Sequence, residues 1–128
     1  MSITAKDLEN ILDLDYDKEI EKITSGIREI LRKKLNRRGL VVAMSGGIDS
    51  SVSSALAVKA LGTKKVFGLL LPETDSSSFS TDRGTQLAEH LGIEYQLVNI
   101  APTLEAIGCY QWRDDAIRSV FPEYGDGW

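Results

Sequence analysis

The residues best suited to chemistry lie in one short run, Ser45-Gly46-Gly47-Ile48-Asp49-Ser50-Ser51. Gly46 and Gly47 are free to take positive φ, and they let a ligand approach the backbone without meeting a β-carbon. A helix that begins at about Asp49 aims its unpaired N–H groups and the positive pole of its dipole into the same space. The three serine hydroxyls add hydrogen-bond donors. Together these features predict a cradle for an anion, most naturally a phosphate or pyrophosphate.

Asp49 does not suit an anion cradle unless a cation accompanies the anion. A carboxylate repels a phosphate beside it, so Asp49 is predicted to bind Mg²⁺ in a nucleotide–metal complex. The alternative is that Asp49 only complements the dipole of the helix that it opens. The glycines and hydroxyls around it favour the metal.

Other chemistries find less support in the sequence. The run lacks the lysine of the common P-loop and the spacing of the dinucleotide fingerprint. No G-x-S-x-G motif surrounds Ser45, so a serine hydrolase is not indicated. The single histidine, His90, is expected on a helix surface, and the single cysteine, Cys109, is expected to be a small core residue rather than a nucleophile.

Residues 45–50 match the S-G-G-x-D-S signature of the ATP pyrophosphatases, the adenine nucleotide α-hydrolase-like superfamily. Within that superfamily the chain resembles the NAD synthetases. The resemblance is carried by five segments: Gly39–Ser51, Phe67–Ser77, Leu87–Ile93, Arg113–Ala116 and Pro122–Tyr124. Arg83 and Gly84 depart from it, because the family tends to have small and acidic residues there.

The resemblance implies an ATP-dependent ligase of NAD biosynthesis. Such an enzyme activates the carboxylate of deamido-NAD as an acyl-adenylate, releases pyrophosphate and then admits ammonia, with no covalent nucleophile. Asp49 would bind Mg²⁺, and ATP would contact Ala43, Met44, Ser45, Gly46, Gly47, Ile48, Asp49, Ser50, Ser51 and Leu71. Glu73 and Asp75 are either further metal or ribose contacts or solvated loop charges.

Two other functions stay open at this point. One is an ATP-dependent enzyme that amidates or thiolates another carboxylate or a tRNA base, although the acidic balance of the chain counts against tRNA. The other is a regulatory module that binds ATP without adenylating a substrate.

The elements around the run predict an α/β fold. Hydrophobic periodicity predicts two opening helices, Thr4–Leu14 and Asp17–Asn36, the second closed by Gly39. Short apolar runs predict strands, the first buried on both faces. In chain order the further elements are a strand at Leu40–Met44, a helix at Asp49–Leu61 closed by Gly62, a strand at Val66–Leu71, a polar loop at Glu73–Ser80, a helix ending near Leu91 with Gly92 as its cap, a strand at Ile93–Ile100, and short helices at Thr103–Cys109 and Arg113–Phe121.

This order predicts a partial doubly wound parallel sheet of Rossmann-like type, preceded by two helices. Ligands of such sheets bind outside the carboxyl ends of the strands, which places the predicted site at residues 45–51, 72–80 and 101–103. We expect one structural domain, with N-terminal helices in residues 1–38 and an ATP-pyrophosphatase domain in residues 39–128. Cations gather at the end of the second helix, where they suit the helix dipole or, alternatively, reach a phosphate: Arg28, Arg32, Lys33, Lys34, Arg37 and Arg38.

Composition and length limit the partners and the cellular compartment that we expect. The net charge of −4 over 128 residues argues against nucleic acid or an anionic membrane as the main partner. One cysteine and no signal-like segment are typical of a soluble cytoplasmic protein. NAD synthetases are about twice this length, so the nucleotide domain is expected to be incomplete and its first strand to be an exposed apolar edge. The chain is therefore expected to be a fragment of a longer protein, the alternative being a short protein whose sheet is completed in a homodimer or by another chain. By itself the chain is expected to bind ATP at most weakly and to make little or no amide.

Overall fold

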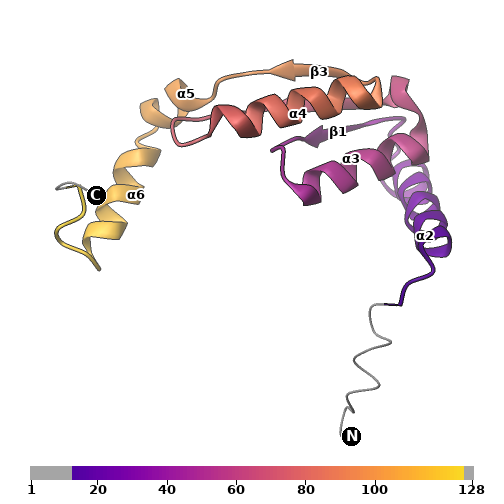
Figure 1. Ribbon diagram of the computed structural model, residues 1–128, viewed down its shortest axis with the longest axis horizontal. Helices are drawn as coiled ribbons and strands as arrows, with labels where there is room; N and C mark the ends of the chain where they lie inside the picture. The colour runs from indigo at the N-terminus through magenta and orange to yellow at the C-terminus, as the bar shows by residue number, and fades with distance from the viewer. Residues whose placement is uncertain (1–12, 126–128) are drawn as a thin grey trace, which may run out of the picture.

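A computed structural model describes residues 13–125, which form three parallel strands and the helices that connect them (Figure 1). The elements are α2 (Tyr16–Glu29), the π-helical turn η1 (Ile30–Lys34), β1 (Leu40–Ala43), α3 (Ile48–Leu61), the 3₁₀ turn η2 (Thr63–Lys65), β2 (Val66–Leu70), α4 (Ser78–Leu91), β3 (Glu94–Leu97), α5 (Ala101–Ala106) and α6 (Cys109–Arg118). The α/β prediction is confirmed. The predicted helix at 4–14 lies outside the described residues except for residues 13 and 14, which are not helical. No helix in residues 13–125 has the length and apolar character of a membrane span.

The strands lie in the order β1-β2-β3, and all neighbours are parallel. Because strand order follows chain order, two right-handed crossovers place α3 and α4 on the same face of the sheet. One core confirms this arrangement: it joins Met44, Val66, Leu70 and Ile93 to Ala57 of α3 and Ala88 of α4. The carboxyl ends of β1 and β2 therefore open at the same edge, beside the first turns of both helices (Figure 1).

β1 is the edge strand, as expected, but it is not buried on both faces. Val42 packs against the core, whereas Val41 on the opposite face is 63% exposed. Val41 pairs in register with Phe67, which also points away from α3 and α4. The prediction of two-sided burial is wrong because no helix of the described residues covers this second face.

The end of the second predicted helix also differs from expectation. α2 passes through the π-helical turn, and Asn36, with φ of 51°, takes the left-handed conformation that was assigned to Gly39. Gly39 serves close approach instead, since a Cβ there would lie 2.6 Å from the carbonyl oxygen of Lys65. Gly62 and Gly92 take positive φ after α3 and α4, which confirms both predicted caps.

The cations at the end of α2 and η1 do not reach the predicted phosphate site. Arg28 donates to the carbonyl oxygen of Ala60 at the end of α3 (3.4 Å) and pairs with Glu21 (3.1 Å). Arg38 lies beside the start of β1. Both positions are at the amino-terminal edge of the strands, opposite the Ser45–Ser51 run, so the phosphate interpretation of these charges is wrong for this site.

Candidate functional site

The two adjacent glycines of the β1–α3 loop have different roles. Gly46 has φ of +76°, and a Cβ there would lie 2.3 Å from the carbonyl oxygen of Ser80 in the first turn of α4. Gly47 is the N-cap of α3 with φ of −83°, and a Cβ there would meet only the hydroxyl of Ser45 at 3.4 Å. Both glycines were predicted to be free to take positive φ, and only Gly46 has a positive φ. Gly46 therefore shapes the loop, whereas Gly47 leaves the backbone open to a ligand.

Three serine hydroxyls hold this loop in shape. Ser50 donates to the carbonyl oxygen of Gly47 (3.0 Å) and accepts from the N–H of Ser45 (3.3 Å). Ser51 donates to the same carbonyl (2.8 Å), and the N–H of Gly47 donates to the hydroxyl of Ser45 (3.3 Å). These hydroxyls organise the loop internally instead of pointing to a ligand. The donors left for an anion are the N–H groups of the first turn of α3, which have no intrahelical partner.

Asp49 lies in the first turn of α3 with an exposed side chain. No group of three or more His, Cys, Asp or Glu side chains in residues 13–125 is arranged to hold a metal ion. Within the described residues Asp49 therefore belongs to no cluster of three or more such side chains. An isolated carboxylate is compatible with Mg²⁺ bound to a nucleotide, since Mg²⁺ uses one or two carboxylates and fills its other positions with phosphate oxygens and water.

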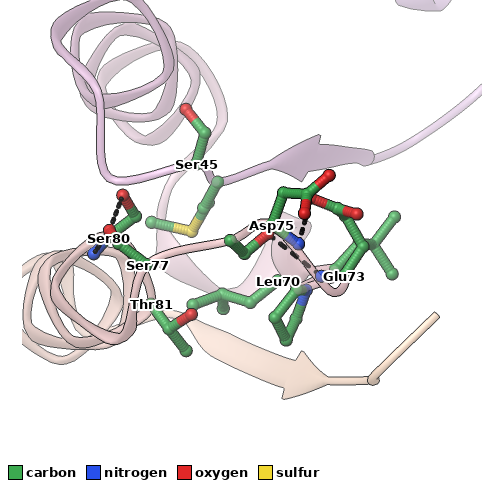
Figure 2. Close-up of a pocket in the computed structure, with 11 residues that line it drawn as sticks. Ser45, Leu70, Glu73, Asp75, Ser77, Ser80 and Thr81 are labelled. Carbon is green, nitrogen blue, oxygen red and sulfur yellow. Dashed lines mark hydrogen bonds between the residues drawn. The ribbon is translucent and has the colours of Figure 1, made fainter. Parts of the chain in front are cut away.

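A pocket of about 380 Å³ lies at the carboxyl ends of β1 and β2. Figure 2 shows Ser45 on the loop after β1, Ser77, Ser80 and Thr81 at the start of α4, and Leu70 at the end of β2; the hydroxyl of Ser45 points away from the α4 residues. The lining residues are Met44, Ser45, Leu70, Leu71, Pro72, Glu73, Asp75, Ser76, Ser77, Ser80 and Thr81. The pocket thus offers an apolar floor and a hydroxyl-rich wall, which suits a small ligand with both apolar and polar edges.

The structure brings only part of the predicted ATP site to this pocket. Met44, Ser45 and Leu71 line it. A separate open hollow between α3 and α4 is lined by Gly46, Ile48, Ser51, Arg83, Gln86 and Leu87. The other predicted contacts line neither space: Ala43, Gly47, Asp49 and Ser50. The predicted residues therefore surround the start of α3, with the pocket on one side.

Glu73 and Asp75 already have partners within the protein, although the side chain of Asp75 is 61% exposed. Glu73 accepts from the N–H of Asp75 (3.0 Å) with one carboxylate oxygen and from the hydroxyl of Tyr110 (3.0 Å) with the other. Asp75 pairs with the guanidinium of Arg113 on α6. The hydrogen bond that Arg113 donates to the carboxylate of Asp114, with a smaller contribution from the charge of Asp75, raises the pKa of Arg113. Two α6 residues therefore hold the loop wall of the pocket.

Sequence reasoning missed Tyr110 and the start of α4. Tyr110 and Arg113 are three positions apart on α6, so they share a helix face, but that spacing does not say what they face. Ser77 is the N-cap of α4, and its hydroxyl accepts from the N–H of Ser80 (3.1 Å). The serine-rich loop contained this cap signal, S-x-x-S before an apolar pattern, which was treated as loop.

Both residues that depart from the family pattern have a place in this packing. The guanidinium of Arg83 lies 4.0 Å above the ring of Phe79, away from the pocket. A Cβ on Gly84 would lie 2.8 Å from a methyl of Leu70 and 3.3 Å from the carbonyl oxygen of Met44. Gly84 therefore lets α4 approach the floor of the pocket closely.

The lone histidine and cysteine take no part in the pocket. His90 is exposed in the last turn of α4, which confirms its surface assignment. Cys109 is only partly buried at the start of α6, a helix without a buried residue, so the core assignment of Cys109 is wrong.

Comparison with known proteins agrees with the sequence resemblance. A model of the NAD synthase family matches residues 19–119. The chain is 51% identical over 117 residues to the NH(3)-dependent NAD(+) synthetase of Rhizobium meliloti, covering 91% of this chain and 35% of that protein. It is 41% identical over 96 residues to the protein of the same name from Methanocaldococcus jannaschii, covering 73% of this chain and 37% of that protein. The chain spans about a third of the length of the curated relatives that it matches, so these relatives are longer than the twofold length that the resemblance led us to expect.

Solved structures show the same likeness. The NH3-dependent NAD synthetase of Campylobacter jejuni superposes with a TM-score of 0.68 and 31% identity, covering 76% of this chain and 42% of that one. An NMN synthetase from Francisella tularensis superposes with a TM-score of 0.64 and 27% identity, covering 78% of this chain and 41% of that one.

Proposed function

The chain belongs to the NAD synthase family, and we propose that it supplies the ATP-binding part of an ammonia-dependent NAD synthetase. In this proposal ATP activates the carboxylate of deamido-NAD as an acyl-adenylate, pyrophosphate leaves, and ammonia displaces AMP to give the amide. Residues 39–128 would be the nucleotide-binding domain, preceded by helices in residues 1–38. We place the reaction in the cytoplasm, with a homodimer or another chain completing the sheet beside β1.

The observation that carries this proposal is the pairing of two features at one sheet edge. The Ser45–Gly47 loop and the first turn of α3 offer N–H donors to an anion, and the pocket beside them offers an apolar floor at Met44 and Leu70. The pocket suits the adenosine, and the helix start suits the phosphates. A nucleotide has both parts, an apolar base and an anionic phosphate chain.

Each group then has a defined task in the first half-reaction. Leu71 and Met44 contact the adenosine, and the N–H groups of the first turn of α3 stabilise the charge that develops on the departing pyrophosphate. Asp49 would hold Mg²⁺, which when bound neutralises charge on the pyrophosphate leaving group. The chemistry needs no covalent nucleophile, and the partly buried Cys109 is not assigned one.

The experiment is calorimetric titration of the chain with ATP, with Mg²⁺ and with a chelator. We expect weak binding that depends on Mg²⁺ and that Asp49→Asn abolishes. Asp82→Asn is the matched control, since Asp82 is also exposed near the start of a helix but lines neither space. Absence of ATP binding at millimolar nucleotide, or equal binding by both variants, would contradict the assignment.

A second measurement addresses the reaction itself. Pyrophosphate release is followed with ATP, Mg²⁺ and ammonia, in the presence and in the absence of deamido-NAD. We expect little or no release from this chain alone, because β1 has no neighbour on its open side within residues 13–125. Turnover at an enzyme-like rate would show that the 128-residue chain assembles a whole site by itself.

A further inference from the structure

Beyond its packing on α5, α6 is hydrogen-bonded to the pocket loop through the side chains of Tyr110 and Arg113. None of its residues is buried, and it packs mainly on α5, its neighbour in the chain. Figure 1 shows α6 projecting past the carboxyl edge of the sheet instead of covering a face. Tyr110 and Arg113 nevertheless reach back across 36 to 38 positions in the sequence to the loop between β2 and α4. A helix that adds little to the core is thus tied to the wall of the pocket.

The tie is centred on the hydroxyl of Tyr110. This hydroxyl donates to Glu73 (3.0 Å) and accepts from the N–H of Thr74 (3.2 Å), so both of its hydrogen-bonding functions are used on the loop. Arg113 pairs with Asp75, and its guanidinium lies 5.2 Å from the centre of the Tyr110 ring. Three consecutive loop residues are therefore fixed by one face of α6.

Within the described part of the chain, residues 73–76 are the part of the pocket wall that makes no hydrogen bond to the sheet or to the start of α4. Before it, the N–H of Ile100 donates to the carbonyl oxygen of Pro72 (3.0 Å), which extends the pairing of β2 and β3. After it, Ser77 caps α4. Between these anchors Glu73, Asp75 and Ser76 line the pocket. The position of these three residues depends on the α6 contacts and on hydrogen bonds within the loop.

The tie also changes the charge that a nucleotide meets. Glu73 and Asp75 bring two carboxylates to the wall of a pocket that would hold a polyanion. Arg113 pairs with one of them, and the Tyr110 hydroxyl binds the other. Unpaired carboxylates in the wall of the pocket would repel the phosphates, most strongly at low ionic strength.

We propose that Tyr110 and Arg113 are positioning residues of the nucleotide pocket, which hold the Glu73–Ser76 wall in place from α6 and compensate its negative charge. Neither residue lines the pocket, so neither is assigned a contact with the nucleotide. The identity of the ligand rests on the proposed function, whereas the restraint on the loop does not. Displacement of α6 would then loosen the pocket from outside it.

The restraint is tested first, without nucleotide, by NMR measurement of amide exchange in the intact chain. Tyr110→Phe removes one hydroxyl, and we expect exchange at the amide of Thr74 to become roughly two- to tenfold faster. Tyr16→Phe is the matched control, because Tyr16 is 72% exposed on α2. Unchanged exchange at Thr74 in Tyr110→Phe would overturn the restraint.

The effect on the pocket is tested by titration with ATP and Mg²⁺ at low and high salt. We expect Arg113→Gln to weaken binding about two- to fivefold, more at low salt. The double variant with Asp75→Asn should recover part of the loss, because it removes the carboxylate left unpaired. Arg118→Gln is the control, since it breaks an ion pair with Asp115 on the same helix and leaves the loop alone.

The outcomes separate this inference from the proposed function. Equal affinities of Arg113→Gln and Arg118→Gln would overturn the positioning role in binding, as would a double variant no better than Arg113→Gln. If the unmodified chain binds no ATP, the proposed function fails together with the nucleotide part of this inference, and the exchange rate at Thr74 alone decides the restraint.

Discussion

Alanine at Gly46 and alanine at Gly47 should have different effects, although the two residues are adjacent. An L-residue at the φ of +76° found at Gly46 costs roughly 1–2 kcal/mol. A methyl group 2.3 Å from the carbonyl oxygen of Ser80 also forces the loop and the first turn of α4 apart. Overpacking of this kind costs roughly 1–3 kcal/mol. Gly46→Ala is therefore expected to lower the free energy of unfolding by about 2–5 kcal/mol, a large share of the total of roughly 5–15 kcal/mol for a domain.

Gly47 offers the control at the next position. Its φ of −83° and ψ of 166° suit any residue, and the added Cβ would make an ordinary contact with Ser45 at 3.4 Å. Gly47→Ala should change the free energy of unfolding by less than about 1 kcal/mol, and it should stabilise if it changes anything, because alanine restricts the unfolded chain. Its affinity for ATP should nevertheless fall, because the methyl group lies where the backbone is open to the phosphates.

The assay is urea unfolding followed by far-ultraviolet circular dichroism, with the midpoint and the slope compared among the three proteins. ATP affinity is then measured on the folded variants. A Gly46→Ala protein as stable as the unsubstituted chain would refute the packing argument. A Gly47→Ala protein that is equally stable and binds ATP equally well would refute the assignment of the ligand to this stretch of backbone.

Three further outcomes follow from the packing, the charge and the edge of the sheet. Gly84→Ala should lower the urea midpoint by an amount equivalent to about 1–3 kcal/mol, because its Cβ would lie 2.8 Å from a core leucine methyl, whereas Gly26→Ala, with nothing within 4 Å, should raise it. A hydrogen bond with the Lys18 side chain lowers the pKa of Asp15 below 3.8, so this contribution to stability is present above that pH and is lost as the pH falls through the folded-state pKa. The protection factors of amides in the first turn of α2, corrected for the intrinsic pH dependence of exchange, should therefore fall as the pH drops through this pKa, and this step should vanish in Asp15→Asn, which keeps the cap. Val41→Lys should reduce self-association in sedimentation experiments without a large change in stability, since Val41 is 63% exposed on an edge strand; unchanged association would contradict that role.

Most of the fold was predictable because its signals are local. The apolar runs, the three-and-four-residue spacing of apolar residues and the terminal glycines place β1, α3, β2 and α4 to within a few residues. Gly39 was misassigned because two glycine uses look alike in sequence: a left-handed cap and a close approach. The structure gives the cap to Asn36 and the approach to Gly39, where β1 begins next to Lys65.

The candidate site was predictable on one side only. The role of the Ser45–Ser51 run can be predicted from the sequence, since it combines glycines, hydroxyls and a helix start within seven residues. The role of the pocket wall cannot, because Glu73 and Asp75 bind residues 37 and 38 positions later. No periodicity or spacing pairs a loop carboxylate with a distant tyrosine or arginine. Only the path of the chain through α5 into α6 brings these residues together.

The open face of the sheet connects the fold to the site. β1 and β2 carry apolar side chains on both faces of the sheet, including Val41 and Leu69 on the face that α3 and α4 do not cover. This pattern is typical of strands that are buried on both sides. In a doubly wound sheet the strand order reverses beside the first strand, and the ligand crevice forms at that reversal. Here the strand at the edge is β1, and the loop that follows it carries Gly46 and Gly47. A strand added beside β1 would therefore place the Gly47 backbone and Asp49 inside a crevice instead of on its rim, and ATP affinity should rise with the covering of this edge.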